Sequence, residues 1–444
     1  MANLEKCRES STLSLDPSDH LVQSEHYEHP VTGTTDAPGT TLPAIDTGFQ
    51  AWLQVLSGCL LLFNCWGLVL SFGTFETYYV TGGIRNTDSR SDVAWIGSLQ
   101  AFLLNIGAPV LGQLTDCGHF KTLVATGSFL VVFGMMMTSL CTEYWQFFLA
   151  QGVCVGIGIG CLLIPGITIP IGWFQKRRGL ALGLVTVGST VGGVIYSIAL
   201  YKLQPLIGLP WATRVFGFIA LVTLIIPNVT LKQRVTPGKR SSMIDLTVFT
   251  DPVFALLIAS LFFTFLGLLV PYHFIVLFAE ENHIYLYGMS TFYLLPIMNA
   301  GSCIGRTFPA WLADKVGPLN VLIPGMAMSG LLVFCWIPAK TGASVIIIAI
   351  VYGFASGVVA VSPPIAAASL TEDMSRFGAR TGIVFAIMSV ASLLGSPISG
   401  AIIQAQDGNY DGARIYAGLV MLAGAILLLA GRMIRTKGKW LIKV

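Results

Sequence analysis

The chain has 444 residues, of which 54% are hydrophobic and only 11% are charged, with a net charge of +3 and a mean hydropathy of +0.75. Soluble domains carry about 25% charged residues, so this chain has too few charges to cover the surface of a water-soluble protein of its length. The composition excludes an ordinary soluble protein and indicates that lipid surrounds much of the surface.

The first 47 residues are a polar segment that precedes the apolar part of the chain. They contain eight acidic and two basic residues and lack the apolar core of a signal peptide. We expect residues 1–47 to be a disordered cytosolic tail, because such a segment cannot bury enough apolar surface to fold. The nine cysteines show no CxxC spacing, so we expect them to be packing residues and predict no disulfide framework and no metal site.

Twelve apolar runs of membrane-spanning length follow this tail, and we expect each of them to be a transmembrane helix. Their approximate bounds are 51–79, 93–114, 122–141, 145–173, 179–201, 211–231, 252–279, 287–313, 321–337, 343–370, 381–404 and 413–434. The expected fold is an all-α membrane protein with twelve transmembrane helices.

The longest internal polar segment divides the twelve runs into six and six. We expect four parts after the tail: an N-terminal half at 48–231, a cytosolic linker at 232–251, a C-terminal half at 252–434, and a short cytosolic tail at 435–444. With a cytosolic N-terminus, the segments on the cytosolic side carry eighteen Lys and Arg and those on the other side carry six. Such an excess is typical of cytosolic loops, so we expect both termini to be cytosolic.

Two polar motifs, one in each half, separate neighbouring apolar runs. The first is GQLTDCGHFK at residues 112–121, and its echo is AWLADKVGPLN at residues 310–320. An aspartate near a helix N-terminus is stabilised by about 0.3–1 kcal/mol, and a glycine allows close helix contact. We therefore expect a cytosolic gate formed by Gly112, Asp116, Gly118, Lys121, Asp314 and Gly317. The alternative role of Asp116 is a simple helix cap.

This arrangement resembles the major facilitator superfamily, which has a related Gly/Asp motif after its second helix. In the present chain Gly118 stands one position early and most of the family's basic residues are missing, so we expect a weaker gate contact. The resemblance implies a secondary-active transporter of two six-helix halves. Substrate would bind between the halves near the bilayer midplane while the halves rock.

A closer resemblance, to the fungal branch of the monocarboxylate-porter family, covers nearly all of residues 44–434. It rests on DTGFQAW at 46–52, WFQKRRGLALG at 173–183, and Gly305-Arg306 followed by WLAD at 311–314. The chain departs from the animal carriers at two positions. Leu70 stands near their substrate-binding lysine, and Ser302 replaces an aspartate one turn before Arg306. The proton-coupling scheme of the animal carriers is therefore not transferred to this chain.

Arg306 lies deep within an apolar run, where an arginine is costly unless it faces a polar cavity. We expect Arg306 to bind an anionic group of the substrate; the alternative is a structural arginine bonded to backbone carbonyls. The other residues that we assign to the substrate path are Asn299, Ser302, Tyr272, His273, Asn64 and Asn105. His273 either carries a proton or packs as a hydrogen-bonded residue, and we expect Glu76 to reach water near the outer end of its helix.

The sequence contains no nucleotide-binding loop and no catalytic constellation, so we expect neither an enzyme nor a cofactor. The expected partners are a small-molecule substrate, with proton coupling as an option, and the lipid bilayer, without nucleic acid. We expect a monomer in the plasma membrane that exports a secondary metabolite, a small and partly anionic organic molecule. Uptake of a monocarboxylate or a riboflavin-like vitamin is the alternative, and a non-transporting sensor is a further one.

Overall fold

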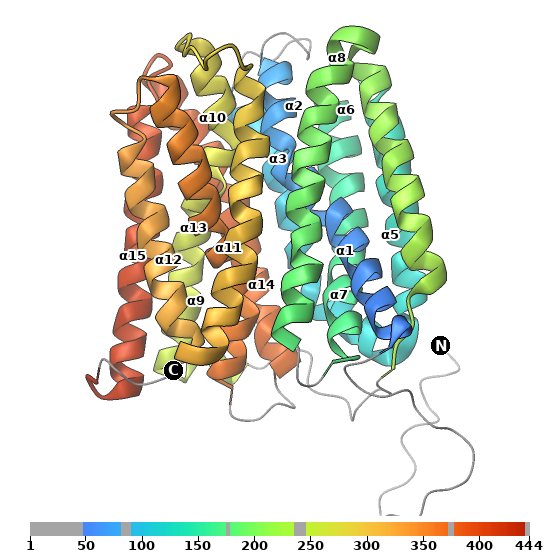
Figure 1. Cartoon of the computed structure of the whole chain (residues 1–444), viewed down its shortest axis with the longest axis vertical. Coiled ribbons are helices and arrows are strands. Elements are labelled where there is room, and N and C mark those ends of the chain that lie inside the picture. Colours follow the sequence, from blue (N-terminus) through green and yellow to red (C-terminus); the bar gives the residue numbers. More distant parts are fainter. Residues whose placement is uncertain (1–47, 81–89, 175–177, 235–245, 372–376, 440–444) are drawn as a thin grey trace, which may run out of the picture. The chain divides into compact units, whose positions relative to one another are not determined.

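The computed structural model describes residues 48–80, 90–174, 178–234, 246–371 and 377–439 (Figure 1). The expected tail at 1–47 and most of the expected linker at 232–251 lie outside these ranges. The described residues form helices joined by short turns, and no β-strand occurs among them.

The helices of the N-terminal half follow the expected apolar runs. They are α1 (Phe49–Leu70), α2 (Phe72–Tyr78), α3 (Arg90–Ile106), α4 (Ala108–Leu114), η2 (Thr115–His119), α5 (Phe120–Thr138), α6 (Tyr144–Phe147), η3 (Phe148–Val155), α7 (Gly156–Ile171) and α8 (Arg178–Thr230). The helices α3 and α4 form one span with a bend of 44°. Helix α8 contains the fifth and sixth runs, and the chain turns between them at Gly208, whose φ is 76° (Figure 1).

The C-terminal half repeats this pattern. Its helices are η4 (Leu246–Phe249), α9 (Pro252–Leu268), α10 (Val270–Glu281), η5 (Thr291–Tyr293), α11 (Leu294–Val316), α12 (Pro318–Cys335), α13 (Gly342–Ser369), α14 (Phe377–Ala405) and α15 (Asp411–Thr436). The eighth run begins as a helix later than the expected residue 287. The reason is a turn at Leu286–Met289, in which Gly288 has a φ of 84°.

Nine helical segments of the described residues are long and apolar enough to cross a membrane, and the bent α3–α4 pair is a tenth. That count takes α8 as one segment and omits α11, which contains Arg306. When both arms of α8 and α11 are included, all twelve expected helices are present.

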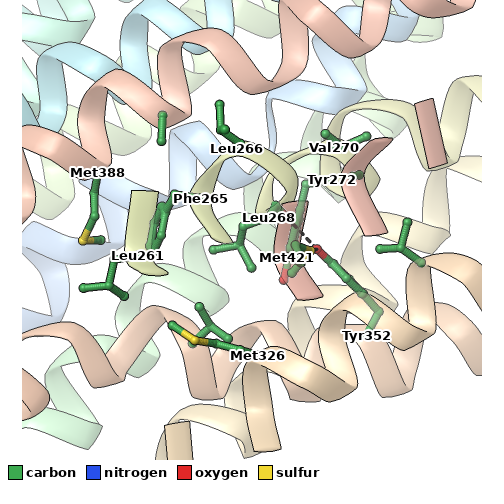
Figure 2. Packing of buried hydrophobic residues seen from close by; sticks show 14 of the residues in the cluster. Leu261, Phe265, Leu266, Leu268, Val270, Tyr272, Met326, Tyr352, Met388 and Met421 are labelled. Atoms are coloured by element: carbon green, nitrogen blue, oxygen red, sulfur yellow. Dashed lines mark hydrogen bonds between the residues drawn. The ribbon is translucent and has the colours of Figure 1, made fainter. Parts of the chain in front are cut away.

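Two large clusters of buried side chains fill the described part of the molecule. One draws mainly on the C-terminal half, where Leu261, Phe265, Met326 and Met421 lie close together (Figure 2). The other draws mainly on the N-terminal half. Because lipid tails are as apolar as leucine, close packing rather than exclusion of water holds such helices together.

We call the end at which α1 begins and α15 ends the lower end, and the opposite end, where α2 and α10 end, the upper end (Figure 1). At the lower end, Gln54 of α1 donates to the carbonyl of Thr230 over 3.0 Å. At the upper end, Tyr78 of α2 stacks on Phe292 of η5, with ring centroids 5.0 Å apart. The second contact joins the N-terminal half to the C-terminal half.

Candidate functional site

A cavity of about 720 Å³, its open side included, lies between side chains of both halves. The N-terminal half contributes Leu62, Trp66, Leu70, Leu163, Ile167, Leu182 and Thr186. The C-terminal half contributes Phe265, Leu268, Leu269, Tyr272, Arg306, Ser356, Ala360, Val361, Pro364, Phe385 and Met388. A mostly apolar lining with a few polar groups is typical of sites for small organic ligands.

The two walls of the cavity differ in polarity. The wall from the N-terminal half has the indole ring of Trp66 and aliphatic side chains, with Thr186 as its one hydroxyl group. The wall from the C-terminal half carries Arg306, Tyr272 and Ser356, and the hydroxyl oxygens of Tyr272 and Ser356 lie 3.0 Å apart. The hydrogen-bonding capacity and the positive charge of the site are therefore concentrated on one side.

Arg306 supplies that positive charge. Its Nε donates to the hydroxyl of Ser302 over 3.3 Å, one helical turn earlier, and only 4% of its surface is exposed. Within the described ranges, neither a carboxylate nor a backbone carbonyl is bonded to Arg306. The side chain of Arg306 lines the cavity, and its described contacts differ from those of an arginine held by backbone carbonyls.

Two glycines of α11 place Arg306 beside α13. A side chain at Gly301 or at Gly305 would clash with the carbonyl oxygens of Ile350 and Phe354 on α13. Close approach of the two backbones is therefore possible only with glycine at these positions. It brings the guanidinium of Arg306 to the cavity edge that Ser356 also lines.

The three asparagines expected in the substrate path lie outside the cavity lining. Asn64 is satisfied within the N-terminal half, because it donates to Thr223 over 2.9 Å and accepts from the Tyr196 hydroxyl over 2.7 Å. Asn105 donates to the carbonyl of Ala101 over 3.1 Å. Asn299 donates to the carbonyl of Leu295 and packs against Gly193, at a contact of α11 with α8.

Glu76 and His273 form a buried pair above the cavity. The Nδ1 of His273 on α10 lies 2.8 Å from Oε2 of Glu76 on α2, and the two side chains are 1% and 0% exposed. The expectation that Glu76 reaches water is therefore wrong. The upper half of α2 faces the C-terminal half here, so the carboxylate meets a histidine instead of solvent.

Close packing joins the two halves at the upper end. A side chain at Gly73 of α2 would clash with the carbonyl oxygen of Tyr272 on α10. Beyond this contact, the ring of Phe292 stacks on Tyr78 and on Tyr201, with centroids 5.0 and 5.3 Å apart. Among the described residues, the two halves are therefore in close contact at this end.

The two gate motifs lie at the lower end. Gly118 has a φ of 87° and Gly317 a φ of 101°, values that glycine adopts far more readily than other residues. The expected close contact at Gly112 is not present, because a side chain there would meet only Ile164, at 3.9 Å. Lys121 is exposed, and the side chains of Asp116 and Asp314 lie outside the described part of the structure.

Sequence reasoning did not select Trp66, Thr186, Ser356 or Glu76 as site residues. Trp66 and Thr186 sit in apolar runs like many packing residues, and Ser356 lies in a helix rich in small residues. Only Glu76 carried a signal, because a carboxylate within an apolar run is costly unless it is paired.

Comparison with known proteins identifies the family. A family model described as Major Facilitator Superfamily matches residues 55–373 and 299–442. The chain is 42% identical over 386 residues to the MFS-type transporter dbaD of Emericella nidulans, with 86% of each chain covered. It is 37% identical over 401 residues to the aspyridones efflux protein apdF of the same organism, covering 89% of this chain and 80% of the relative.

A third relative, the MFS transporter asaE of Aspergillus flavus, is 34% identical over 406 residues, with 90% of each chain covered. These matches extend over both halves and include the helices that line the cavity. The chain therefore belongs to the major facilitator superfamily, and it is a multi-pass membrane transporter and not an enzyme.

Proposed function

We propose that this transporter exports an organic acid whose anionic group binds at Arg306. The observation that carries the proposal is a buried guanidinium at the cavity wall that has Ser302 as its bonded neighbour and no carboxylate partner among the described residues. A buried cation without a counter-ion is costly. A substrate carboxylate or enolate would supply the missing charge and accept charge-assisted hydrogen bonds from the guanidinium.

Export is the direction that the relatives favour. One of them is named as an efflux protein for aspyridones, and its match covers 89% of this chain. We therefore infer that the cargo is a secondary metabolite of a fungus. The alternative is uptake of a monocarboxylate or a vitamin, in which transport would run into the cell.

We further propose that the halves at 48–231 and 252–434 rock about the cavity in a protein that works as a monomer. The close contacts between the halves at the upper end, together with the cavity between them, are consistent with a state in which the upper end is closed. In this scheme Gly112, Asp116, Gly118, Lys121, Asp314 and Gly317 change their contacts at the lower end. The excess of Lys and Arg in the loops at the lower end supports a cytosolic position for that end and for both termini. We also propose that the transporter lies in the plasma membrane and that a proton gradient drives transport.

Deletion of the gene tests direction and cargo together. If the chain is an exporter, untargeted mass spectrometry should show at least one compound that rises inside the deletion strain and falls in its medium. The compound should carry an acidic group that is ionised at neutral pH. A compound that moves the opposite way would indicate uptake, and a neutral compound would contradict the role of Arg306.

Transport into inside-out membrane vesicles then tests the anion requirement. The compound identified by deletion should accumulate in vesicles that contain the transporter, whereas its methyl ester should not compete for transport. The ester keeps the size and apolar surface of the acid, so it is a matched control. Equal competition by the ester would mean that the negative charge is not recognised.

A further inference from the structure

The pair of Glu76 and His273 links the two halves of the transporter at a buried point. Glu76 lies on α2 in the N-terminal half and His273 on α10 in the C-terminal half, with 2.8 Å between Oε2 and Nδ1. No other contact between a carboxylate and a histidine occurs among the described residues. Neither residue lines the cavity, so the pair is separate from the site at Arg306.

The surroundings of the pair are apolar and closed. The ring of Phe72 lies 5.3 Å from the imidazole of His273, and Gly73 presses α2 against the backbone of α10. All four polar atoms of the pair, both carboxylate oxygens of Glu76 and both ring nitrogens of His273, are buried, and none has a hydrogen-bond partner outside the pair in the described structure. The two side chains therefore depend on each other for their polar contact.

The ionisable groups on the packed elements are engaged with other atoms. On α2 the hydroxyl of Tyr79 donates to Gln151, and on α10 the hydroxyl of Tyr272 meets Ser356. The charged groups are Arg306 (α11) with Ser302, Lys315 (α11) over the Trp311 ring, Lys202 (α8) over the Tyr201 ring, Arg214 (α8) with Ser139, Glu280 (α10) with Thr291, Glu281 (α10) with Tyr410, Arg380 (α14) over the Phe254 ring, Asp251 at the start of α9, and the exposed Asp92 (α3). None of these contacts involves Glu76 or His273.

We propose that Glu76 and His273 form a proton-binding site that takes up one proton when the upper end closes. In the closed state the pair holds one proton in total. Removing it would leave a buried carboxylate without a counter-charge, and adding a second would leave a buried imidazolium without one; both states are costly. When the halves separate, each group meets water and titrates by itself. This inference rests on the proposed movement of the two halves.

The proton count fixes the direction of the pH effect. A water-exposed histidine has a pKa of about 6.5 and a water-exposed glutamate one of about 4.3. Above pH 6.5 the open state holds no proton, so opening releases one and rising pH favours it, by up to about tenfold in the open-to-closed ratio per pH unit. Between these pKa values both states hold one proton and pH has no effect. Below pH 4.3 the open state holds two protons, and acid again favours opening.

The separation of the two halves at the upper end can be measured without a substrate. Thr142 in the N-terminal half and Tyr285 in the C-terminal half are exposed at that end. Spin labels attached through encoded ketone amino acids at these positions report the distance between the halves in lipid nanodiscs. We expect the population with the longer distance to be constant from pH 5 to 6 and to increase steeply from pH 6.5 to 8.5.

Variants of the two residues should change this response in different ways. Glu76→Gln should give a distance distribution that is the same from pH 6.5 to 8.5, because His273 alone holds no added proton in either state. His273→Gln should instead extend the response to pH 5–6, because a lone buried carboxyl stays protonated when closed and ionises when open. The exchange Glu76→His with His273→Glu keeps the pair and should restore the pH dependence, which guards against a variant that fails to fold. His283→Gln and Asp407→Asn, at exposed sites of the same end, are the matched controls and should respond like the unmodified protein.

Two results would overturn the proton site. One is a distance distribution of the unmodified protein that does not change with pH, and the other is a full pH response in Glu76→Gln. Neither result bears on the binding of an acid at Arg306, which the vesicle assay measures by itself. Loss of the pH response in Glu76→Gln, with the acid requirement intact, would support both proposals.

Discussion

Two regions of this transporter each bury an arginine, and they treat it differently. At the upper end, the guanidinium of Arg414 on α15 lies 4.0 Å from the ring centre of Phe278 and 4.5 Å from that of Trp336. It also donates to Asp411 over 3.1 Å and to the carbonyl of Ile337 over 3.4 Å. At the cavity, Arg306 has one bond to a serine hydroxyl and an open side.

The comparison separates a cation that the protein surrounds from the cation that we propose to bind the substrate. Both arginines are at least 96% buried, so burial by itself does not distinguish them. The difference is the number of groups that the protein provides for the charge. Arg414 connects α10, α15 and the turn after α12 through rings, a carboxylate and a carbonyl, whereas among the described residues Arg306 is bonded only to the hydroxyl of Ser302.

The largest effect is expected at the cavity. Arg306→Gln should weaken substrate binding by about 10- to 100-fold, because a hydrogen bond to a charged group contributes about 1.5–3 kcal/mol. Arg306→Lys should weaken substrate binding less than Arg306→Gln does, because lysine keeps the positive charge but loses the planar fork of the guanidinium. Concentration-dependent transport in vesicles measures both variants. Arg435→Gln, at an exposed position of α15, is the control. An unchanged substrate affinity in Arg306→Gln would mean that Arg306, like Arg414, does not bind the substrate.

A smaller effect, on stability instead of transport, is expected at the upper end. Arg414→Gln should destabilise the folded protein by about 2 kcal/mol, because it removes desolvated cation–π contacts. Thermal unfolding of the purified protein should show a lower midpoint, while transport per folded molecule stays constant. If Arg414→Gln instead lost transport at unchanged stability, Arg414 would belong to the transport mechanism.

A moderate effect on binding is expected beside Arg306. Tyr272→Phe keeps the ring and removes the hydroxyl that meets Ser356, so it should reduce substrate affinity by about fivefold, the equivalent of one neutral hydrogen bond of about 1 kcal/mol. Tyr352→Phe is the matched comparison, because its hydroxyl bonds the carbonyl of Leu268 inside the core (Figure 2). That variant should affect unfolding but not substrate affinity. Affinity loss in Tyr352→Phe alone would contradict the assignment.

The smallest effect is expected at Asp411. Its side chain is 48% exposed, so its ion pair with Arg414 is screened by solvent, and Asp411→Asn should cost less than about 1 kcal/mol. The unfolding midpoint should shift by much less than in Arg414→Gln. A shift as large as that of Arg414→Gln would mean that the carboxylate, and not the aromatic rings, holds this arginine.

Hydropathy predicted the helices because the bilayer imposes a length and an apolar composition on each span. All twelve expected runs coincide with helices, and the exceptions are boundaries such as the late start of α11 after the turn at Gly288. The sequence also singled out Arg306, which lines the cavity, because a charge in an apolar run is costly wherever the helix packs.

Tertiary structure decided which polar residues face each other. Asn64 and Glu76 both stand in the first apolar run, but Asn64 is satisfied by Thr223 and Tyr196, whereas Glu76 meets His273 of the other half. No local pattern encodes such pairings, because they depend on how helices far apart in sequence approach and rotate. The apolar runs of this chain thus determined its fold class, while the partner of each buried polar group was set by packing between the two halves.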